Sequence, residues 1–506
     1  MMLERSAPMR SFLAFAVVPD VTVAKLLVMG AALTSLFIDQ SFGGVFSTIQ
    51  GYVSGTLGAT ADEAPWFLIG YNAFYYTLIL LTPWLMARFG RRAVFSIGHV
   101  IFGAISLYLA TTDSLHGFMI GRCFQGLAQG TFFVCSVITV LTLFPVRLRG
   151  YAFSVFSVTS LSGAASGSFV GGWFIDHAYW RGAFVLYAAF AILSGLVISL
   201  LLDAEGPKKM PAFDLAGVTS AFVAFIGFQY VSAFGERRDW LSAPDIVAFG
   251  GLTLVAFAAF VWRELTSDRR AFIHLKLYKI HNLAVASVLG LGLGVPLLGA
   301  NLFLQYAQSV LGLPPSTAGA LLMLRILSVV FFAPAAVLLV NADKIDVKVP
   351  VALGFVLVPI SYALLAVQTT GLSDFTTFVA AIVISGAGFA CLFSPIANAT
   401  VRSLPENARA EGIAIFKMVL LLGGSSATTV LGVIYDHSYA GYLSLLAGDA
   451  TLRHVAQIGL GAATGGLAGV VEQQAAILAY ADNSKWVALA SLINLPLIAL
   501  LRKPGS

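Results

Sequence analysis

An acidic residue, Asp39, lies deep inside an apolar stretch of the sequence. Residues 26–50 form a run long enough to cross a bilayer as a helix, and Asp39 is the only acid that we place within any such run. An ionised carboxylate at that depth costs about 2.5–3.5 kcal/mol, so it requires a partner cation, a proton or a water-filled cavity. Asp39 is therefore a candidate proton carrier.

An arginine, Arg122, is expected at a compatible depth. Because a helix rises 1.5 Å per residue, Asp39 lies roughly 16 Å and Arg122 roughly 9 Å from the outer ends of their spans, a difference that the long arginine side chain bridges. Pairing would keep the carboxylate ionised, and loss of the partner in a dry site would favour its protonation. We expect Asp39 and Arg122 to form a switchable proton-coupling pair. The alternative is a static ion pair that fixes helix packing.

Polar and aromatic residues at helical spacing extend this candidate site. Gln125 and Gln129 follow Arg122 at i+3 and i+7 and share its helix face. Buried amides require hydrogen-bond partners, which favours a cavity wall. The predicted substrate-cavity residues are Phe42, Phe46, Gln125, Gln129, Asn301, Gln305, Arg325 and Lys417. For the two phenylalanines, helix packing is the more usual role.

Two of these residues, Arg325 and Lys417, are cations in spans that contain no acid. Together with Arg122 they outnumber Asp39, which favours an anionic or acid-bearing amphiphilic substrate over a cationic one. The alternative is that one or both extend to the membrane interface or bond backbone carbonyls. Lys417 is the better candidate for such an extension, because it lies near the start of its span.

The composition indicates a polytopic membrane protein. Of 506 residues, 58% are hydrophobic and 10% charged, and the mean hydropathy is +0.89, whereas soluble domains carry about 25% charged residues. The seven histidines and three cysteines form no metal-ligand or disulfide pattern. No nucleophile stands with a base at catalytic spacing. We expect no enzyme activity, no metal, no cofactor beyond a proton gradient and no nucleic-acid partner.

Apolar runs of about 20 residues, the length that crosses a bilayer, recur along the chain. We predict fourteen transmembrane helices near residues 26–50, 65–86, 93–111, 116–140, 152–175, 182–202, 215–234, 246–262, 283–308, 317–340, 350–368, 375–398, 412–435 and 486–501. An even number places both termini on one side, and the basic residues of alternate loops put that side in the cytoplasm. The prediction is a multi-pass inner-membrane (cell-membrane) protein with both termini cytoplasmic.

Three further features concern packing and partners. Gly163, Gly167 and Gly171 are spaced for close helix packing. The loop motif with Arg88, Gly90 and Arg91 combines a tight turn with cations at the membrane edge, suited to gating or to topology alone. The long outer loop 437–483 is either a solvent-side helical hairpin or a docking surface for a periplasmic adaptor protein.

Taken together, six motifs resemble the major facilitator superfamily, in its fourteen-span drug:proton antiporter branch of EmrB/QacA type. They are Phe37-Ile-Asp39, Leu85-Met-Ala-Arg-Phe-Gly-Arg-Arg92, Ile120-Gly-Arg-Cys-Phe-Gln-Gly126, Trp180-Arg-Gly-Ala-Phe184, Phe213-Asp-Leu-Ala-Gly217 and Gly235-Glu-Arg-Arg-Asp-Trp240. Their order and spacing cover nearly the whole chain. Departures are Ala87, where an acid is common, Ser168, where the family carries proline, and Lys417, which replaces a neutral amide.

The resemblance implies an all-α membrane protein of the major facilitator fold. A cytoplasmic tail (1–25) precedes two six-helix halves (26–202 and 282–506), which an inserted helix pair with its flanking loops (203–281) separates; each half contains inverted three-helix repeats. It also implies proton-coupled export of amphiphilic small molecules or drugs, by a chain expected to be a monomer in the lipid bilayer, with Asp39 and Arg122 in the family's acid and arginine roles. A uniporter or importer of an organic anion or lipid on the same fold is the alternative.

Overall fold

The computed structural model describes residues 22–145, 148–205, 212–266, 273–371, 373–449 and 464–502. These residues form helices and no strand, as expected where a bilayer leaves the backbone no other hydrogen-bond partners. The α-helices are α2 (Val23–Leu57), α3 (Trp66–Phe89), α4 (Arg91–Thr111), α5 (Leu115–Gln129), α6 (Phe132–Leu143), α7 (Arg149–His177), α8 (Arg181–Leu201), α9 (Leu215–Phe234), α10 (Pro244–Thr266), α11 (His281–Ser309), α12 (Pro315–Met323), α13 (Arg325–Asn341), α14 (Lys348–Gln368), α15 (Val379–Ser403), α16 (Arg409–Asp449) and α18 (Thr464–Leu492). Short 3-10 helices are η3 (Glu236–Arg238), η4 (Trp240–Ser242), η5 (Leu275–Lys279), η6 (Phe375–Phe378), η7 (Glu406–Ala408) and η8 (Pro496–Leu500).

Twelve helical stretches of the described residues are long and apolar enough to cross a membrane. Two of them combine paired helices, α5 with α6 and α12 with α13. Helices α3 and α11 lie at two further predicted positions but are not among the twelve; α11 qualifies only as a shorter apolar helix over residues 281–296. The structure is therefore an all-helical membrane protein, and this criterion does not confirm the predicted number of fourteen.

Residue-level signals set several helix ends. Thr22 caps α2 by accepting a hydrogen bond from the Lys25 backbone N–H, and Gly58 ends it with a φ of +65°. Gly90 separates α3 from α4 with a φ of +83°, a conformation that favours glycine. In the short connection between α4 and α5, the Ser114 side chain caps the start of α5.

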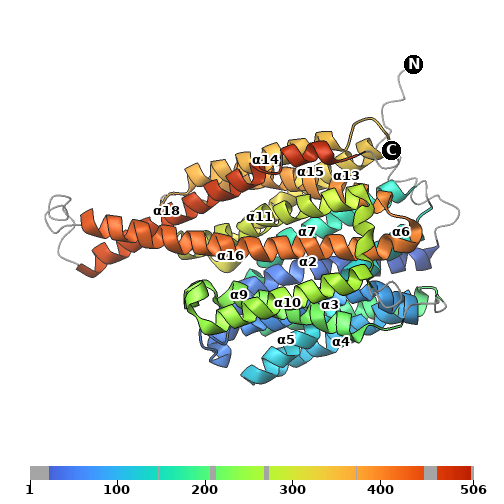
Figure 1. The fold of residues 1–506 in the computed structure, drawn as a ribbon. Helices are drawn as coiled ribbons and strands as arrows, with labels where there is room; N and C mark the ends of the chain where they lie inside the picture. The colour runs from blue at the N-terminus through green and yellow to red at the C-terminus, as the bar shows by residue number, and fades with distance from the viewer. Residues whose placement is uncertain are drawn as a thin grey trace, which may run out of the picture.

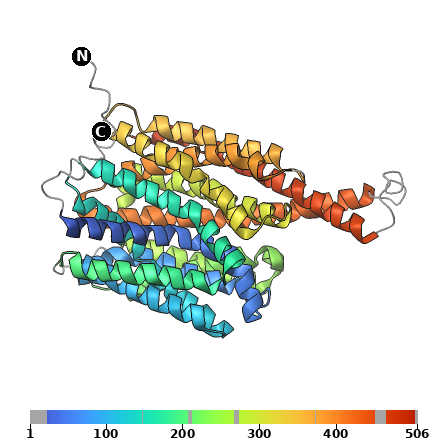
Figure 2. The ribbon, with the colours of Figure 1, turned by 180° about the vertical axis from the view of Figure 1, so that it is seen from behind.

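The helices pack as two groups. Helices α2 to α8, the N-terminal group, contact mainly one another, as do α11 to α18, the C-terminal group. The principal contact between the groups runs from α7 to α12 and α13. Figures 1 and 2 show the long axes nearly parallel, with the start of α2 and the C-terminus at one end, here called the terminal end.

At the opposite end, α16 and α18 project beyond the other helices (Figure 1). They pack on each other: the Tyr435 and Tyr480 ring centroids are 4.5 Å apart, and the Tyr442 hydroxyl donates to Asp482 over 2.6 Å. The segment expected as the outer loop 437–483 is thus largely helical where it is described. The span predicted at 486–501 begins earlier, because α18 starts at Thr464 and its apolar stretch covers Ala468–Leu500.

A glycine ladder on α7 brings α2 very close. A Cβ added to Gly163, Gly167 or Gly171 would lie 3.1, 2.2 or 2.8 Å from a backbone carbonyl oxygen of α2. At Gly172, the same addition would approach Pro315 of α12 to 2.4 Å. Small residues therefore allow α7 to pack closely against helices of both groups.

Helix α9 packs on α10 and contacts both α3 and α16. Gln229 of α9 is buried there. Its amide accepts from Asn72 of α3 over 3.2 Å and donates to Ser425 of α16 over 3.1 Å. One amide thus connects α9 to both groups.

Candidate functional site

Asp39 forms a buried ion pair with Lys417. One carboxylate oxygen accepts from the Lys417 ammonium over 3.2 Å, and the other accepts from the Tyr75 hydroxyl over 2.7 Å. The side chains of Asp39 and Lys417 are 0% and 3% exposed. Because Asp39 lies on α2 and Lys417 on α16, this pair connects the two groups of helices.

The remaining contacts of Lys417 are a neutral amide and an aromatic face. Its ammonium donates to the Gln40 side-chain oxygen over 3.1 Å and lies 4.5 Å from the Phe133 ring centroid. Gln40 in turn donates to Ser160 of α7 over 2.7 Å. Among the described neighbours, Asp39 is the counter-charge that balances Lys417.

This arrangement corrects two expectations from the sequence. Lys417 does not extend to an interface, since its side chain is buried and paired. Asp39 pairs with this lysine, and Arg122 makes other contacts: it donates to the Phe67 carbonyl over 3.3 Å and to Gln125 over 2.5 Å. A similar depth in the membrane is necessary for pairing, but residues on several helices lie at a similar depth. The cation nearest to the Asp39 carboxylate comes from α16.

Arg122 lies instead in an aromatic pocket of the N-terminal group. Its guanidinium carbon is 3.8 Å from the Phe46 ring centroid and 4.1 Å from that of Tyr71. Such stacking stabilises a desolvated arginine. Phe42 is fully buried with it, edge-on to Tyr187 at 5.1 Å. Phe42 and Phe46 thus pack in the core in this arrangement, and their predicted cavity role stays a prediction.

The two glutamines of the polar stripe are also buried in this group. Gln125 accepts from Arg122 and donates to Ser106 over 2.8 Å. Gln129 donates to the Asp39 backbone carbonyl over 3.2 Å, and its side-chain oxygen has no partner among the described residues. Gln129 thereby links the stripe to the helix segment that carries the ion pair.

The predicted cavity residues of the C-terminal group differ in their burial. Arg325 is buried, donates to Ser385 over 2.9 Å and lies 5.0 Å from the Phe389 ring centroid. Gln305 is exposed, because α11 turns the face with Phe303 and Tyr306 inward. The side chain of Asn301 lies outside the described residues.

A pocket beside the ion pair lies between the two groups, toward the terminal end. Four phenylalanines line it, Phe133, Phe153, Phe156 and Phe416, together with aliphatic residues and the hydroxyl of Thr400. Phe133 also faces the Lys417 ammonium. In this arrangement the pocket has about 10 Å³ of accessible space, roughly enough for one water molecule, so a ligand requires the groups to separate.

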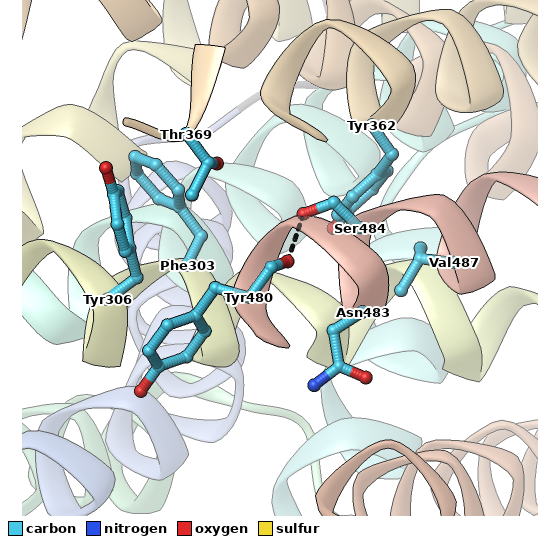
Figure 3. Close-up of a pocket in the computed structure, with 8 residues that line it drawn as sticks. All are labelled: Phe303, Tyr306, Tyr362, Thr369, Tyr480, Asn483, Ser484 and Val487. Carbon is cyan, nitrogen blue, oxygen red and sulfur yellow. Dashed lines mark hydrogen bonds between the residues drawn. The ribbon is translucent and has the colours of Figure 1, made fainter. Parts of the chain in front are cut away.

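A second pocket lies within the C-terminal group (Figure 3). Its lining comes from α11, α14 and α18, including Tyr306, Tyr362 and Asn483. Asn483 is 1% exposed, and neither polar atom of its amide has a partner among the described residues. Sequence reasoning missed this residue because we placed it in a loop.

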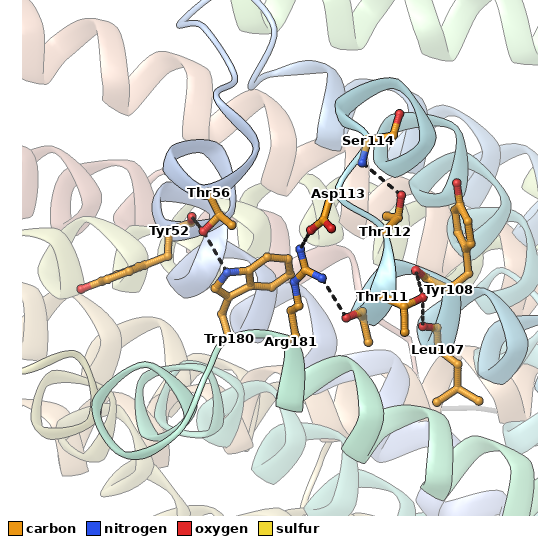
Figure 4. A network of polar contacts seen from close by, with 11 residues as sticks. Tyr52, Thr56, Leu107, Tyr108, Thr111, Thr112, Asp113, Ser114, Trp180 and Arg181 are labelled. Carbon is orange, nitrogen blue, oxygen red and sulfur yellow. Dashed lines mark hydrogen bonds and ion pairs between the residues drawn. The ribbon is translucent and has the colours of Figure 1, made fainter.

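The loop and helix-end motifs make ion pairs and hydrogen bonds within the N-terminal group. Arg91 pairs with Glu205 over 2.8 Å and donates to Thr142 over 2.5 Å, while Arg88 is exposed. At the opposite end, Figure 4 shows Trp180 donating to Thr56 over 3.1 Å. Beside it, Arg181 pairs with Asp113 and donates to the Ala110 carbonyl over 3.4 Å.

The described residues contain no cluster of three or more His, Cys, Asp or Glu side chains that would hold a metal ion. The donor set of the site is a carboxylate, an ammonium, a tyrosine hydroxyl and an amide. Groups of these kinds are chemically able to exchange protons and to bind polar parts of a ligand.

Comparisons with known proteins agree with this architecture. Residues 31–428 match the model of the Major Facilitator Superfamily. The multidrug export protein EmrB of Haemophilus influenzae is 25% identical over 389 residues, covering 75% of this chain and 74% of that protein. EmrB of Escherichia coli K12 is 23% identical, covering 82% and 81%.

Solved structures share the fold at low identity. A POT family transporter in complex with a thioalcohol-conjugated peptide has a TM-score of 0.60 at 16% identity, covering 93% of this chain and 96% of that one. A bacterial homologue of the human lysosomal transporter Spinster has a TM-score of 0.57 at 14% identity, covering 95% and 98%. The chain is a transporter rather than an enzyme, and it belongs to the Major Facilitator Superfamily.

Proposed function

We propose that this protein exports amphiphilic small molecules in exchange for protons, by alternating access. The observation that carries the proposal is the ion pair between Asp39 and Lys417, which is buried and joins the two groups of helices. A proton on Asp39 removes the attraction between the groups, and its release restores it. The multidrug export proteins among the relatives support an amphiphilic substrate.

Arg122 has a complementary part in this proposal. It lies in the same group as Asp39, whereas Lys417 belongs to the other group. When the groups separate, Lys417 moves away with α16 and Arg122 stays. We assign Lys417 as the counter-ion of the closed arrangement and Arg122 as the cation that serves Asp39 after separation.

The membrane arrangement is part of the same proposal. We assign fourteen spans, counting α3 and α11, as two six-helix halves around the inserted pair α9–α10. The terminal end faces the cytoplasm of a cell with this protein in its inner membrane. The projecting ends of α16 and α18 would then face outward, where they suit contact with a periplasmic adaptor protein.

The test is transport in proteoliposomes with an imposed pH gradient. We expect wild-type protein to move a fluorescent amphiphile against its gradient, and Asp39→Asn to lose this proton-driven movement. Asp62→Asn is the matched control, because Asp62 is an exposed acid paired with Arg237. Full gradient-driven export by Asp39→Asn would rule out the proposal.

A second candidate function is uniport or import of an organic anion or lipid. The buried cations Arg325 and Lys417 favour it, since they suit a negatively charged group. Addition of substrate outside the proteoliposomes distinguishes the two: exchange and co-movement of protons change the internal pH in opposite directions, and uniport leaves it unchanged.

A further inference from the structure

We propose that Lys417 is a binding site for the anionic head group of an amphiphile, and that protonation of Asp39 opens this site. The inference takes one element from the proposed function, the use of Asp39 as proton carrier. It adds the chemical class of the ligand, and whether proton binding strengthens or weakens the binding of that ligand.

The first step is the charge balance around Lys417. Its ammonium, 3% exposed, contacts the Asp39 carboxylate, the Gln40 amide oxygen and the face of Phe133. When Asp39 takes a proton, the neutral amide and the ring remain. A buried cation left without its counter-charge is strongly destabilised, so an anion that reaches the ammonium is favoured.

The other ionisable groups near Asp39 do not supply that anion. Tyr71 and Tyr75 face it from α3, and the Arg122 guanidinium of α5 stacks on the Tyr71 ring. On the sides formed by α6 and α7, the neighbours Phe133 and Ser160 are uncharged. The counter-charge for Lys417 must therefore come from outside the described site.

The second step is the place for the rest of the ligand. The pocket between the groups begins at Phe133, whose ring also contacts the ammonium, and includes Phe416, the residue before Lys417. Its lining is apolar apart from Thr400. Once the groups separate enough to admit it, an aromatic or aliphatic body suits this apolar lining while an acidic head group contacts Lys417. A cationic head group would meet an ammonium there, which excludes it.

The third step is the sign of the coupling. A ligand anion and an ionised Asp39 would be two like charges at one ammonium, which disfavours their simultaneous presence. Protonation of Asp39 removes this competition, so the anion and the proton bind together. An uncharged amphiphile has no such requirement. The charge of the head group thus determines whether a proton binds together with the ligand at this site.

Binding to the full chain in nanodiscs of zwitterionic lipid tests this inference. The probes are naphthalene-2-sulfonate, a permanent anion, and naphthalene-2-sulfonamide, its uncharged analogue. Calorimetric titrations in buffers of different ionisation enthalpy give both the affinity and the protons taken up. We expect one proton taken up per sulfonate and, over the pH range in which that uptake is measured, an affinity that falls about tenfold per pH unit as the pH rises. The sulfonamide should show neither effect.

Variants of the ion pair provide the decisive comparison. Asp39→Asn should bind the sulfonate tightly at every pH, a gain that a folding defect does not produce. Lys417→Gln should bind it weakly at every pH, and Lys417→Arg should retain binding. Proton release, pH-independent affinity in wild-type protein, or no tighter binding by Asp39→Asn at pH 8 would overturn the inference. Because the measurement involves no transport, failure of proton-driven export would not alter its result.

Discussion

Asp39 and Lys417 are 378 residues apart in the sequence, yet the ammonium nitrogen lies 3.2 Å from a carboxylate oxygen. The pair is closed off from solvent and crosses the boundary between the two groups of helices. It therefore combines two properties, a charge that a proton can cancel and a contact that must break when the groups move apart.

Removing one member of this pair should destabilise the protein in a pH-dependent manner. Lys417→Met leaves the Asp39 carboxylate buried without its cation, a change that costs about 3–5 kcal/mol when the acid is ionised. Protonation of Asp39 relieves that cost, so the loss of thermal stability relative to wild type should be larger at pH 8 than at pH 5.

The double variant Asp39→Asn/Lys417→Met is the control for that measurement. It replaces both charges with neutral side chains and should recover most of the stability that the single lysine variant loses at pH 8. Equal melting temperatures for the single and double variants at pH 8 would show that the unpaired Asp39 carboxylate is not the cause of the loss.

Close packing of α7 on α2 should fail when a methyl group is added. In Gly167→Ala the new Cβ would lie 2.2 Å from the Ser41 carbonyl oxygen, a backbone atom that moves only with the helix. We expect a loss of about 1–3 kcal/mol, the usual cost of overpacking, seen as a lower melting temperature. Gly43→Ala, where no heavy atom lies within 4 Å, should be neutral or stabilising by up to ~1 kcal/mol.

These two regions show what sequence patterns can predict. The spacing of Gly163, Gly167 and Gly171 predicts a helix face for close packing, and all three glycines face α2. Such a pattern is local, because residues four apart share a helix face whatever surrounds them. The all-helical class and the mean span length follow from equally local physics.

The partner of Asp39 was not predictable in this way. Depth along each helix placed Arg122 within reach, but depth does not say which helices are neighbours. That depends on how α16 packs beside α2 and α3, a long-range property of the fold. The same limit applies to Phe42, Phe46 and Gln305, whose positions relative to the core and to solvent depend on helix rotation.

Arg122 should not tolerate replacement by lysine. Its guanidinium uses separate nitrogens for the Phe67 carbonyl and for Gln125, and stacks on Phe46. A lysine ammonium matches the charge but neither the planar stacking nor the fork of donors. We expect Arg122→Lys to lower the transport rate at least tenfold. Arg237→Lys, at an exposed arginine, is the control, and wild-type rates in both variants would contradict the structural role given to Arg122.

Separation of the two groups at the terminal end should be necessary for transport. Here α7 approaches α13 closely: a Cβ placed on Gly150 would lie 3.7 Å from the Asn341 Cβ, within the 3.5–4.5 Å range of disulfides. The double variant Gly150→Cys/Asn341→Cys should therefore form a disulfide on oxidation. That bond holds α7 and α13 together, so the oxidised protein should neither open at this end nor complete a transport cycle.

Reduction should restore the rate, and each single cysteine variant should be insensitive to oxidant. These controls separate the effect of the bond from the loss of the Asn341 hydrogen bonds to Asn398 and Arg402. Undiminished transport by fully cross-linked protein would show that the groups do not part here, and would place the opening motion elsewhere in the bundle.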